Sequence, residues 1–170
     1  IGLFAYAFQI YFNFSAWSDI AIGLARTMGL DLVENFSSPY KSVSITDFWR
    51  RWHISLSTFL RDHLYIPLGG NRNGTVRTCV NLMIGMLIAG LWHGAQWTFV
   101  TWGAIHGGML ALERLMGKGT PYERMPHGLR VAFTFSVVLV AWVFFRAESF
   151  GAATRYLGVL FGGGTVLPPA

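Results

Sequence analysis

Residues 78–112, TCVNLMIGMLIAGLWHGAQWTFVTWGAIHGGMLAL, form a run of 35 side chains without a formal charge. One helix needs about 20 apolar residues to cross a bilayer, and two helices need about 40 and a turn. The run is therefore too long for one upright helix and tight for two, and a break at His93 and Gly94 resolves the mismatch. Non-helical backbone at membrane depth is tolerated only where protein or a water-filled cavity covers it. We therefore expect a broken membrane segment over 78–112, with a cavity beside His93.

The composition of the whole chain agrees with an integral membrane protein. Of the 170 residues, 53% are hydrophobic and 12% are charged, the latter about half the fraction in soluble domains. Such a composition excludes a disordered chain and counts heavily against a free-standing soluble domain. The single cysteine, Cys79, excludes an internal disulfide framework and a cysteine-based metal site. The sequence begins at Ile1 without the pattern of a signal peptide, so we expect a central fragment of a larger membrane protein.

Two further apolar segments flank the uncharged run and are expected to span the membrane. Residues 1–25 contain one charge, that of Asp19, which is a candidate partner for a buried arginine. Residues 131–146 follow Arg130 and end at Arg146, and arginines at both ends of a short span can reach the two interfaces. The expected fold class is therefore all-α and integral to the membrane.

Residues 26–77 form the most polar part of the chain, with seven basic and four acidic side chains. Apolar residues at a spacing of three to four predict an amphipathic helix over 45–65, lying at the membrane interface or buried among the spans. Thr46 or Asp47 is its expected N-cap. One face of this helix would carry Trp49, Trp52, His53, Leu56, Phe59 and Leu60.

The distribution of charge also bears on orientation and on partners. The basic excess over 26–77 favours the cytoplasmic side for that region. The side of the 113–130 loop stays open, because it depends on whether 78–112 crosses the membrane once or re-enters. Nucleic acid is a poor partner, because the basic residues lie between apolar runs and not on one polar stripe. Membrane lipid is the better explanation.

Five histidines are the candidates for proton transfer near neutral pH. His93 is the strongest, because an ionisable group at membrane depth is a functional-site hypothesis by default; a core histidine bonded to a carbonyl is the alternative. His53 lies on an apolar helix face, where interfacial packing is the stronger alternative. We expect a packing role for His106 and solvated positions for His63 and His127.

Other chemistries find no support in the sequence. It contains no HExxH motif, and the histidine spacings fit no compact zinc site, so no metal is expected. It contains no GxSxG elbow, and the loop at 71–74 lacks the lysine and hydroxyl of a phosphate-binding loop. From the residues alone, an enzyme with a histidine base and a channel or transporter with a histidine relay both stay open.

Three ordered runs of sequence carry a resemblance to a known family. They are FSAWSDIAIG at 14–23 with ENF at 34–36 and PY at 39–40; DFWRRWHISLS at 47–57 with LRD at 60–62 and YIPLGGNR at 65–72; and GLWHGAQWTF at 90–99 with WGA at 102–104 and HG at 106–107. Together they resemble the membrane-bound O-acyltransferases, and YIPLGGNR is most similar to the alginate O-acetyltransferase branch. Trp17 departs from the pattern, because a tyrosine is more usual there.

The resemblance implies a multi-helix membrane bundle with broken or re-entrant and interfacial helices, of which residues 1–170 would be one partial domain. It implies transfer of an acetyl or other acyl group from a donor on the cytoplasmic side to a hydroxyl of an exported polysaccharide or of a relay protein. The donor would be acetyl-CoA or another acyl thioester, with no cofactor permanently bound. The location would be the bacterial inner membrane, with a periplasmic acetyltransferase as a possible partner.

The resemblance also implies which residues do the chemistry. The family's essential histidine corresponds to His93, which would act as general base. Its second motif histidine corresponds to His53, which would orient or polarise the donor thioester. The residues that we expect to line a tunnel for the acyl group are Asp19, Trp49, Trp52, Trp92, Gln96 and Trp97, with packing as the alternative for each tryptophan. A non-catalytic scaffold subunit of a polysaccharide-modification complex is a further rival.

Overall fold

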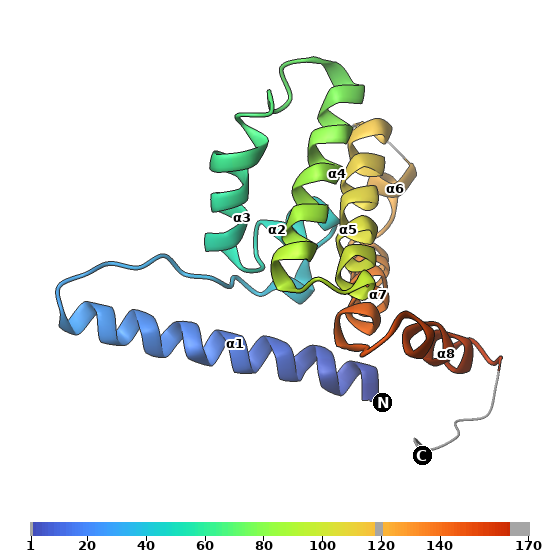
Figure 1. Ribbon diagram of the computed structural model, residues 1–170, viewed down its shortest axis with the longest axis horizontal. Helices are drawn as coiled ribbons and strands as arrows, with labels where there is room; N and C mark the ends of the chain where they lie inside the picture. Colours follow the sequence, from blue (N-terminus) through green and yellow to red (C-terminus); the bar gives the residue numbers. More distant parts are fainter. Residues whose placement is uncertain (1, 118–120, 164–170) are drawn as a thin grey trace.

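The computed structural model describes residues 2–117 and 121–163. The chain folds into helices α1 (Gly2–Thr27), η1 (Pro39–Lys41), α2 (Ile45–Trp49), α3 (Ile54–Leu60), η2 (Arg61–Tyr65, a π-helix), α4 (Gly74–His93), α5 (Trp97–Met116), α6 (Pro121–Arg124), α7 (His127–Arg146) and α8 (Phe150–Leu160). The described residues contain no strand, so the all-α prediction is confirmed for them. Figure 1 shows α1 lying across the base of an upright group that α3, α4 and α5 form.

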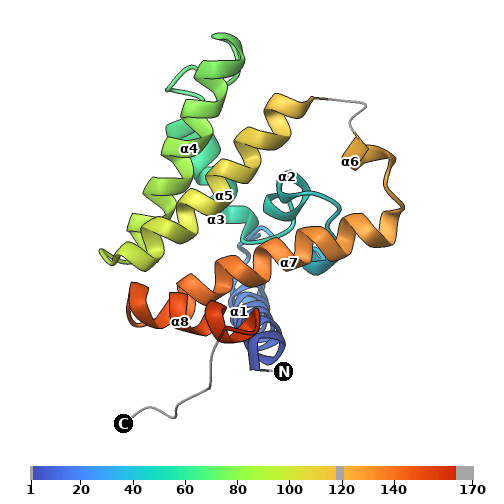
Figure 2. The ribbon, with the colours of Figure 1, turned by 90° about the vertical axis from the view of Figure 1, so that its right-hand side faces the viewer.

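Helices α4 and α5 form a helical hairpin that contains the uncharged segment 78–112. Helix α4 ends at His93, the backbone is extended at Gly94, and α5 begins at Trp97. The two helices make the most extensive helix–helix contact among the described residues, and Figure 2 shows them meeting at the turn and diverging away from it. The start of α4 and the end of α5 therefore lie at the same end of the molecule.

Glycines allow the two backbones of the hairpin to approach closely. A Cβ atom on Gly90 would overlap the backbone carbonyl of Phe99, and a Cβ atom on Gly103 would overlap that of Met86. Small residues at a helix–helix contact are the usual means of close packing between membrane helices. The contact of α4 with α5 thus depends on having hydrogen in place of a side chain at these positions.

Within the described residues, two helices, α4 and α7, are long and apolar enough to cross a membrane. Helix α1 has 26 residues, yet it falls short of that apolarity. The polar side chains along it explain the difference, namely Gln9, Asn13, Ser15, Ser18 and Asp19. That residues 1–25 span the membrane therefore stays a prediction.

The region 45–65 differs from the continuous amphipathic helix that its spacing predicts. Helix α2 ends at Trp49 and α3 begins at Ile54. Between them, His53 has a left-handed backbone, with φ 45° and ψ 57°. A left-handed residue cannot continue a right-handed helix, so the apolar positions are divided between two helices that do not share one face.

The N-terminus of α2 is held by the distant helix α5. Ser44 is the N-cap in place of the expected Thr46 or Asp47, and its hydroxyl accepts from the backbone N–H of Asp47 at 3.0 Å. The Glu113 carboxylate accepts from the backbone N–H groups of Ile45 and Thr46 at 2.6 and 2.9 Å. An acidic group at a helix N-terminus satisfies N–H groups that have no partner within the helix. Glu113 therefore fixes the position of α2 against α5.

An aromatic cluster forms the core where α2, α5 and α7 meet. We use this name for Phe48, Trp49, Trp52, His93, Trp102, His106, Trp142 and Phe145. Most of these side chains are buried, and their ring centroids lie about 5 to 6 Å apart, the separation at which aromatic pairs attract each other. The cluster joins α5 and α7 to the segment that carries His53.

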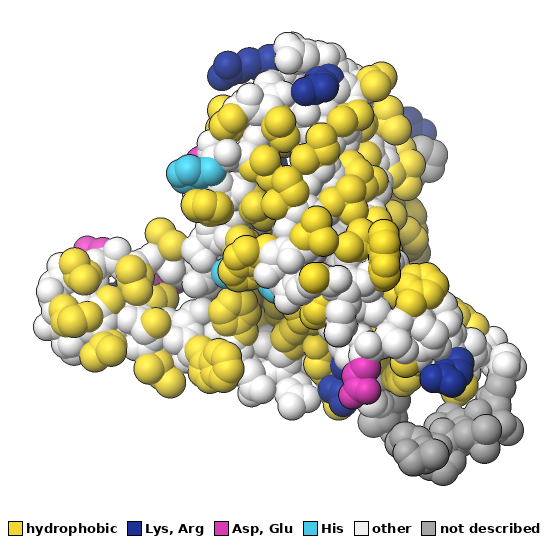
Figure 3. Space-filling model, in the orientation of Figure 1, with side chains coloured by type: hydrophobic (Ala, Val, Ile, Leu, Met, Phe, Trp, Pro, Cys, Tyr) yellow, Lys and Arg dark blue, Asp and Glu magenta, His cyan; other side chains and the backbone are white. Residues whose placement is uncertain are grey.

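The outer surface of the hairpin is apolar. Figure 3 shows hydrophobic side chains over the face of α3 and α4, with lysine or arginine side chains at the end of the molecule where α4 begins. Large exposed side chains on α4 include Val80, Ile88, Leu91 and Trp92. An apolar surface of this kind is typical of a helix that faces lipid or a further part of the protein.

Candidate functional site

His93 is the last residue of α4, and its ring packs against two other helices. The centroid of its ring lies 5.3 Å from that of Trp102 on α5 and 5.0 Å from that of Phe145 on α7, and both contacts are edge-to-face. Within residues 2–117 and 121–163, neither ring nitrogen of His93 has a hydrogen-bond partner. The aromatic contacts thus hold the imidazole in place and leave both nitrogens for a substrate.

His53 lies in the turn between α2 and α3, outside the two helices that are apolar enough to span a membrane. Its ring packs edge-on against Phe14 of α1, with the centroids 4.6 Å apart. Burial lowers the pKa of His53 from 6.5 to about 4, and the nearby imidazole of His93 acts in the same direction. His53 is therefore neutral near physiological pH and lies within electrostatic range of His93.

His106 is fully buried within the aromatic cluster. Its Nδ1 accepts a hydrogen bond from the indole N–H of Trp49 at 3.3 Å, and its ring stacks on Phe48 at 5.9 Å. Since Nδ1 accepts, the proton of the neutral ring is on Nε2, which is buried without a partner among the described residues. His106 thus holds α2 against α5, which agrees with the packing role expected for it.

The tunnel candidates lie in three different places. Trp52 is buried in the aromatic cluster, and Trp49 borders a cavity described below. At the hairpin turn, Trp92 and Trp97 are 65% and 77% exposed, and Gln96 is exposed as well. These three side chains are therefore largely exposed in the described part of the molecule, and the Trp92 ring also packs edge-to-face against His93, with the centroids 4.8 Å apart.

Asp19 and the two polar-region histidines are exposed. The buried ion pair expected for Asp19 is not present among the described residues, because its carboxylate lies on an exposed face of α1. His63 and His127 are exposed, as expected.

A cavity of about 740 Å³ lies between the segment from α2 to η2 and the hairpin. Its wall is mostly apolar, with Leu82 and Met86 of α4 and Trp49 of α2. Polar side chains, among them Arg50 and Arg114, also line it. On α4 and α5 its lining residues fall within 78–86 and 110–114, away from the hairpin turn, and neither His93 nor His53 lines it.

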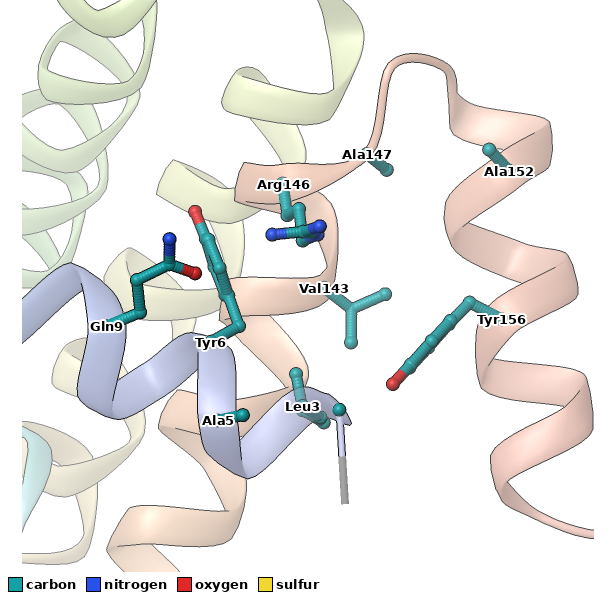
Figure 4. A pocket seen from close by; sticks show the side chains of 10 residues that line it. Leu3, Ala5, Tyr6, Gln9, Val143, Arg146, Ala147, Ala152 and Tyr156 are labelled. Atoms are coloured by element: carbon teal, nitrogen blue, oxygen red, sulfur yellow. The ribbon is translucent and has the colours of Figure 1, made fainter.

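A second cavity, of about 480 Å³, lies between α1, α7 and α8. Figure 4 shows Tyr6, Gln9, Arg146 and Tyr156 around it, and the Arg146 guanidinium lies over the Tyr6 ring, 4.8 Å from its centroid. His93 lines neither of these two cavities, so the cavity expected beside it from the broken segment stays a prediction. The Phe145 ring packs against the imidazole of His93, and the Phe99 ring lies beneath Gly94 at the turn.

Sequence reasoning missed the contributions of three residues to this site. Asn35 contacts His53 through its side-chain oxygen, Glu113 holds α2, and Trp102 packs against His93. Asn35 and Trp102 are part of the motif runs described above, but their contacts join segments far apart in the chain. Glu113 is the first charged residue after the uncharged run, and this position is the sequence feature that could have pointed to a structural role for it.

Comparison with known proteins places these motifs in a family. The profile of the MBOAT, membrane-bound O-acyltransferase family, matches residues 1–151. The chain is 55% identical over 161 residues to a probable alginate O-acetylase AlgI of Pseudomonas putida, covering 95% of this chain and 33% of that protein. It is 46% identical over 160 residues to a peptidoglycan O-acetyltransferase of Helicobacter pylori, covering 93% of this chain and 30% of that protein.

A more distant relative is a teichoic acid D-alanyltransferase of Streptococcus thermophilus, 28% identical over 167 residues, which covers 84% of this chain and 40% of that protein. The chain spans about a third of the length of the alginate O-acetylases that it matches. The profile match covers most of the chain, and the identities favour the alginate branch over the D-alanyltransferases. The chain therefore belongs to the membrane-bound O-acyltransferase family, in its alginate O-acetylase-like branch.

Proposed function

We propose that the full-length protein is an integral membrane O-acyltransferase that moves an acetyl or other acyl group from a thioester donor to a hydroxyl. The acceptor is an exported polysaccharide or a relay protein. The observation that carries the proposal is the pairing of His93, whose ring nitrogens have no hydrogen-bond partner among the described residues, with the neutral His53 nearby. The alginate and peptidoglycan O-acetylating relatives support acetyl as the group and a polysaccharide as the acceptor.

The chemistry requires one group that takes up a proton and returns it. His93 accepts the proton of the acceptor hydroxyl while that oxygen attacks the carbonyl carbon of the thioester. The tetrahedral intermediate then collapses, the C–S bond breaks, and the imidazolium of His93 returns its proton to the departing thiolate. An acetyl ester and a free thiol are the products, and His93 is neutral again.

The indole of Trp102 is a candidate for stabilising the oxyanion of that intermediate. Its Nε1 is buried and has no hydrogen-bond partner among the described residues, and its ring packs against His93. A buried polar hydrogen without a partner is costly, and active sites are where such a group finds its use. A donor aimed at a developing oxyanion is the largest single contribution to many acyl transfers.

In the proposed topology, donor and acceptor reach the site from opposite sides of the inner membrane. The hairpin of α4 and α5 brings the ends of the basic 26–77 region and of the 113–130 loop to one side, which the basic excess over 26–77 favours as cytoplasmic. The donor, acetyl-CoA or another acyl thioester, reaches the site from there. The acceptor, or a periplasmic partner acetyltransferase, approaches from the opposite side, where the turn at 94–96 lies.

The direct test uses the full-length protein in membrane vesicles with a donor labelled in its acetyl group. We expect label to appear in base-labile ester linkage on a hydroxyl of the polysaccharide or of a partner protein. Flux of a solute without covalent transfer would instead support a transporter and contradict the proposal. Vesicles without the protein are the control for transfer by other membrane enzymes.

A further inference from the structure

We infer that Asn35 is a positioning residue that sets the tautomer of His53, so that Nε2 of His53 accepts a hydrogen bond from a second hydroxyl of the acceptor. The inference rests on the proposed function for its substrate. Its structural half, which nitrogen of His53 carries the proton, is independent of any activity. The two halves can therefore be tested separately.

Asn35 is the centre of a hydrogen-bonded network around the turn that carries His53. Its side-chain oxygen accepts from the backbone N–H of Ser55 at 3.1 Å and from the Ser55 hydroxyl at 2.6 Å. Its backbone carbonyl accepts from the N–H of Ile54 at 3.1 Å. Its side-chain N–H₂ donates to the Ser18 hydroxyl of α1 at 3.4 Å. One side chain therefore joins α1, the extended segment before η1 and the start of α3.

These bonds determine the orientation of the Asn35 side-chain amide, and thus which of its atoms faces His53. Because the Ser55 backbone N–H is a donor, the atom that faces it is the amide oxygen. The same oxygen lies 3.4 Å from Nδ1 of His53, and the Ser55 hydroxyl oxygen also lies 3.4 Å from it. The Ser55 hydroxyl hydrogen is committed to Asn35, so both neighbours of Nδ1 offer lone pairs.

A ring nitrogen that faces two acceptors must carry the proton. Nδ1 of neutral His53 is therefore the N–H nitrogen, and Nε2 holds the lone pair. An imidazole in this form accepts a hydrogen bond at Nε2 and cannot polarise the carbonyl of a thioester, because polarisation requires a donor. The role expected for His53 from the sequence, orienting or polarising the donor thioester, is replaced by contact with a hydroxyl.

The backbone of His53 shows that the network holds the residue under strain. A left-handed conformation at a residue other than glycine is unfavourable and persists only when the surroundings impose it. His53 adopts φ 45°, and the residues that follow it, Ile54 and Ser55, are both bonded to Asn35. Asn35 thus fixes the direction of the imidazole as well as its tautomer.

The chemistry of the acceptor indicates which of its groups donates a hydrogen bond to Nε2 of His53. The reacting hydroxyl has one hydrogen, and that hydrogen goes to His93. His53 therefore accepts from another hydroxyl of the same acceptor, and a sugar ring supplies hydroxyls next to the reacting one. His53 in this form orients a polyol and discriminates against an acceptor that has a single hydroxyl.

The first test determines the tautomer by nitrogen NMR of the full-length protein labelled with ¹⁵N-histidine, using His53→Gln to assign the signals. We expect the His53 signals to show a protonated Nδ1 and an unprotonated Nε2. The opposite tautomer would overturn the inference even if acyl transfer is intact. Loss of acyl transfer with the expected tautomer would count against the proposed function alone.

The second test compares Asn35→Asp, Asn35→Ala and the control Asn73→Asp, an exposed asparagine at the start of α4 that makes no side-chain cap bond. Asn35→Asp keeps the acceptor oxygen but adds a negative charge, which raises the pKa of His53 by about one unit or more. Of the groups that act on His53, His93 is the titratable one, while Phe14 of α1 and Asn35 are uncharged.

Below the raised pKa, the His53 ring is an imidazolium and cannot accept a hydrogen bond. As the pH is lowered, we therefore expect KM for the polyol acceptor to begin to rise at a higher pH in Asn35→Asp than in the wild type. At alkaline pH the variant should retain activity. Asn35→Ala should lose about 10- to 100-fold in kcat/KM at every pH, as when a group that orients a histidine is removed. An unshifted profile in Asn35→Asp, or wild-type kinetics in Asn35→Ala, would contradict the inference.

Discussion

The three buried or partly buried histidines differ in the engagement of their ring nitrogens. His106 accepts from Trp49 and is enclosed by aromatic rings, so its role is to hold α2 in place. His53 is bonded through Nδ1 to Asn35. His93 has aromatic contacts and no hydrogen bond among the described residues, which suits a group that must gain and lose a proton. Residue type alone would not separate these roles, because all three are histidines on apolar segments.

The indole N–H of Trp102 is the residue-scale feature that a conservative change can test. Trp102→Phe keeps a large aromatic ring in the cluster and removes the N–H group beside His93. We expect kcat to fall about 10²- to 10³-fold, with little change in KM, as for the loss of one oxyanion donor. Trp142→Phe is the matched control, since that ring packs against Trp102 and Phe145. An equal fall in both variants would contradict a specific role for the Trp102 N–H.

Helix α2 and the hairpin show what can and cannot be predicted at the scale of elements. Local spacing predicts helix over 45–65, but the division at His53 depends on Asn35, 18 residues earlier in the chain. The N-terminus of α2 depends on Glu113, 67 or 68 residues later. Local periodicity contains no information on either contact. By contrast, the length of the uncharged run 78–112 can be read directly from the sequence. Because the run is too long for one membrane-spanning helix, its length alone predicts an interruption.

The close approach of α4 and α5 predicts a sharp difference between two glycines of α5. Gly103→Ala would place a methyl group against the backbone of Met86, which cannot move without shifting α4. We expect a loss of about 1–3 kcal/mol in stability, the usual effect of overpacking. At Gly108 the nearest atom to a new Cβ is the end of the Met83 side chain at 3.9 Å, so Gly108→Ala should be tolerated. Thermal unfolding of the full-length protein in detergent measures both, and equal Tm values would contradict the packing described here.

At the scale of the whole molecule, the described helices would provide part of the proposed membrane site and not its enclosure. The family could be expected from the motif runs, because those runs are continuous in sequence, whereas the catalytic roles of His93 and His53 stay predictions. The walls of a cavity beside His93 could not be predicted in this way, since they would come from segments that are distant in the chain. The exposed Trp92, Gln96 and Trp97 at the hairpin turn are where further parts of a full-length protein would complete the site.

The hairpin makes a topological prediction for the full-length protein. Thr75 at the start of α4 and Leu115 at the end of α5 are exposed and lie at the same end of the hairpin. In a background without other reactive cysteines, Thr75→Cys and Leu115→Cys should react with a membrane-impermeant maleimide from the same side of the membrane. Labelling from opposite sides would show that 78–112 crosses the membrane once. Lysed cells, in which both positions should react, are the control for accessibility.

The central claim is that His93 is the general base of acyl transfer. The most direct measurement is the rate of labelled acetyl transfer by full-length His93→Ala in membranes, normalised to the amount of protein, beside His127→Ala, which removes an exposed histidine at the start of α7. General-base catalysis contributes about 10²- to 10⁴-fold, so we expect at least that loss for His93→Ala with normal expression and near wild-type activity for His127→Ala. Acetyl transfer by His93→Ala at the wild-type rate would contradict the account.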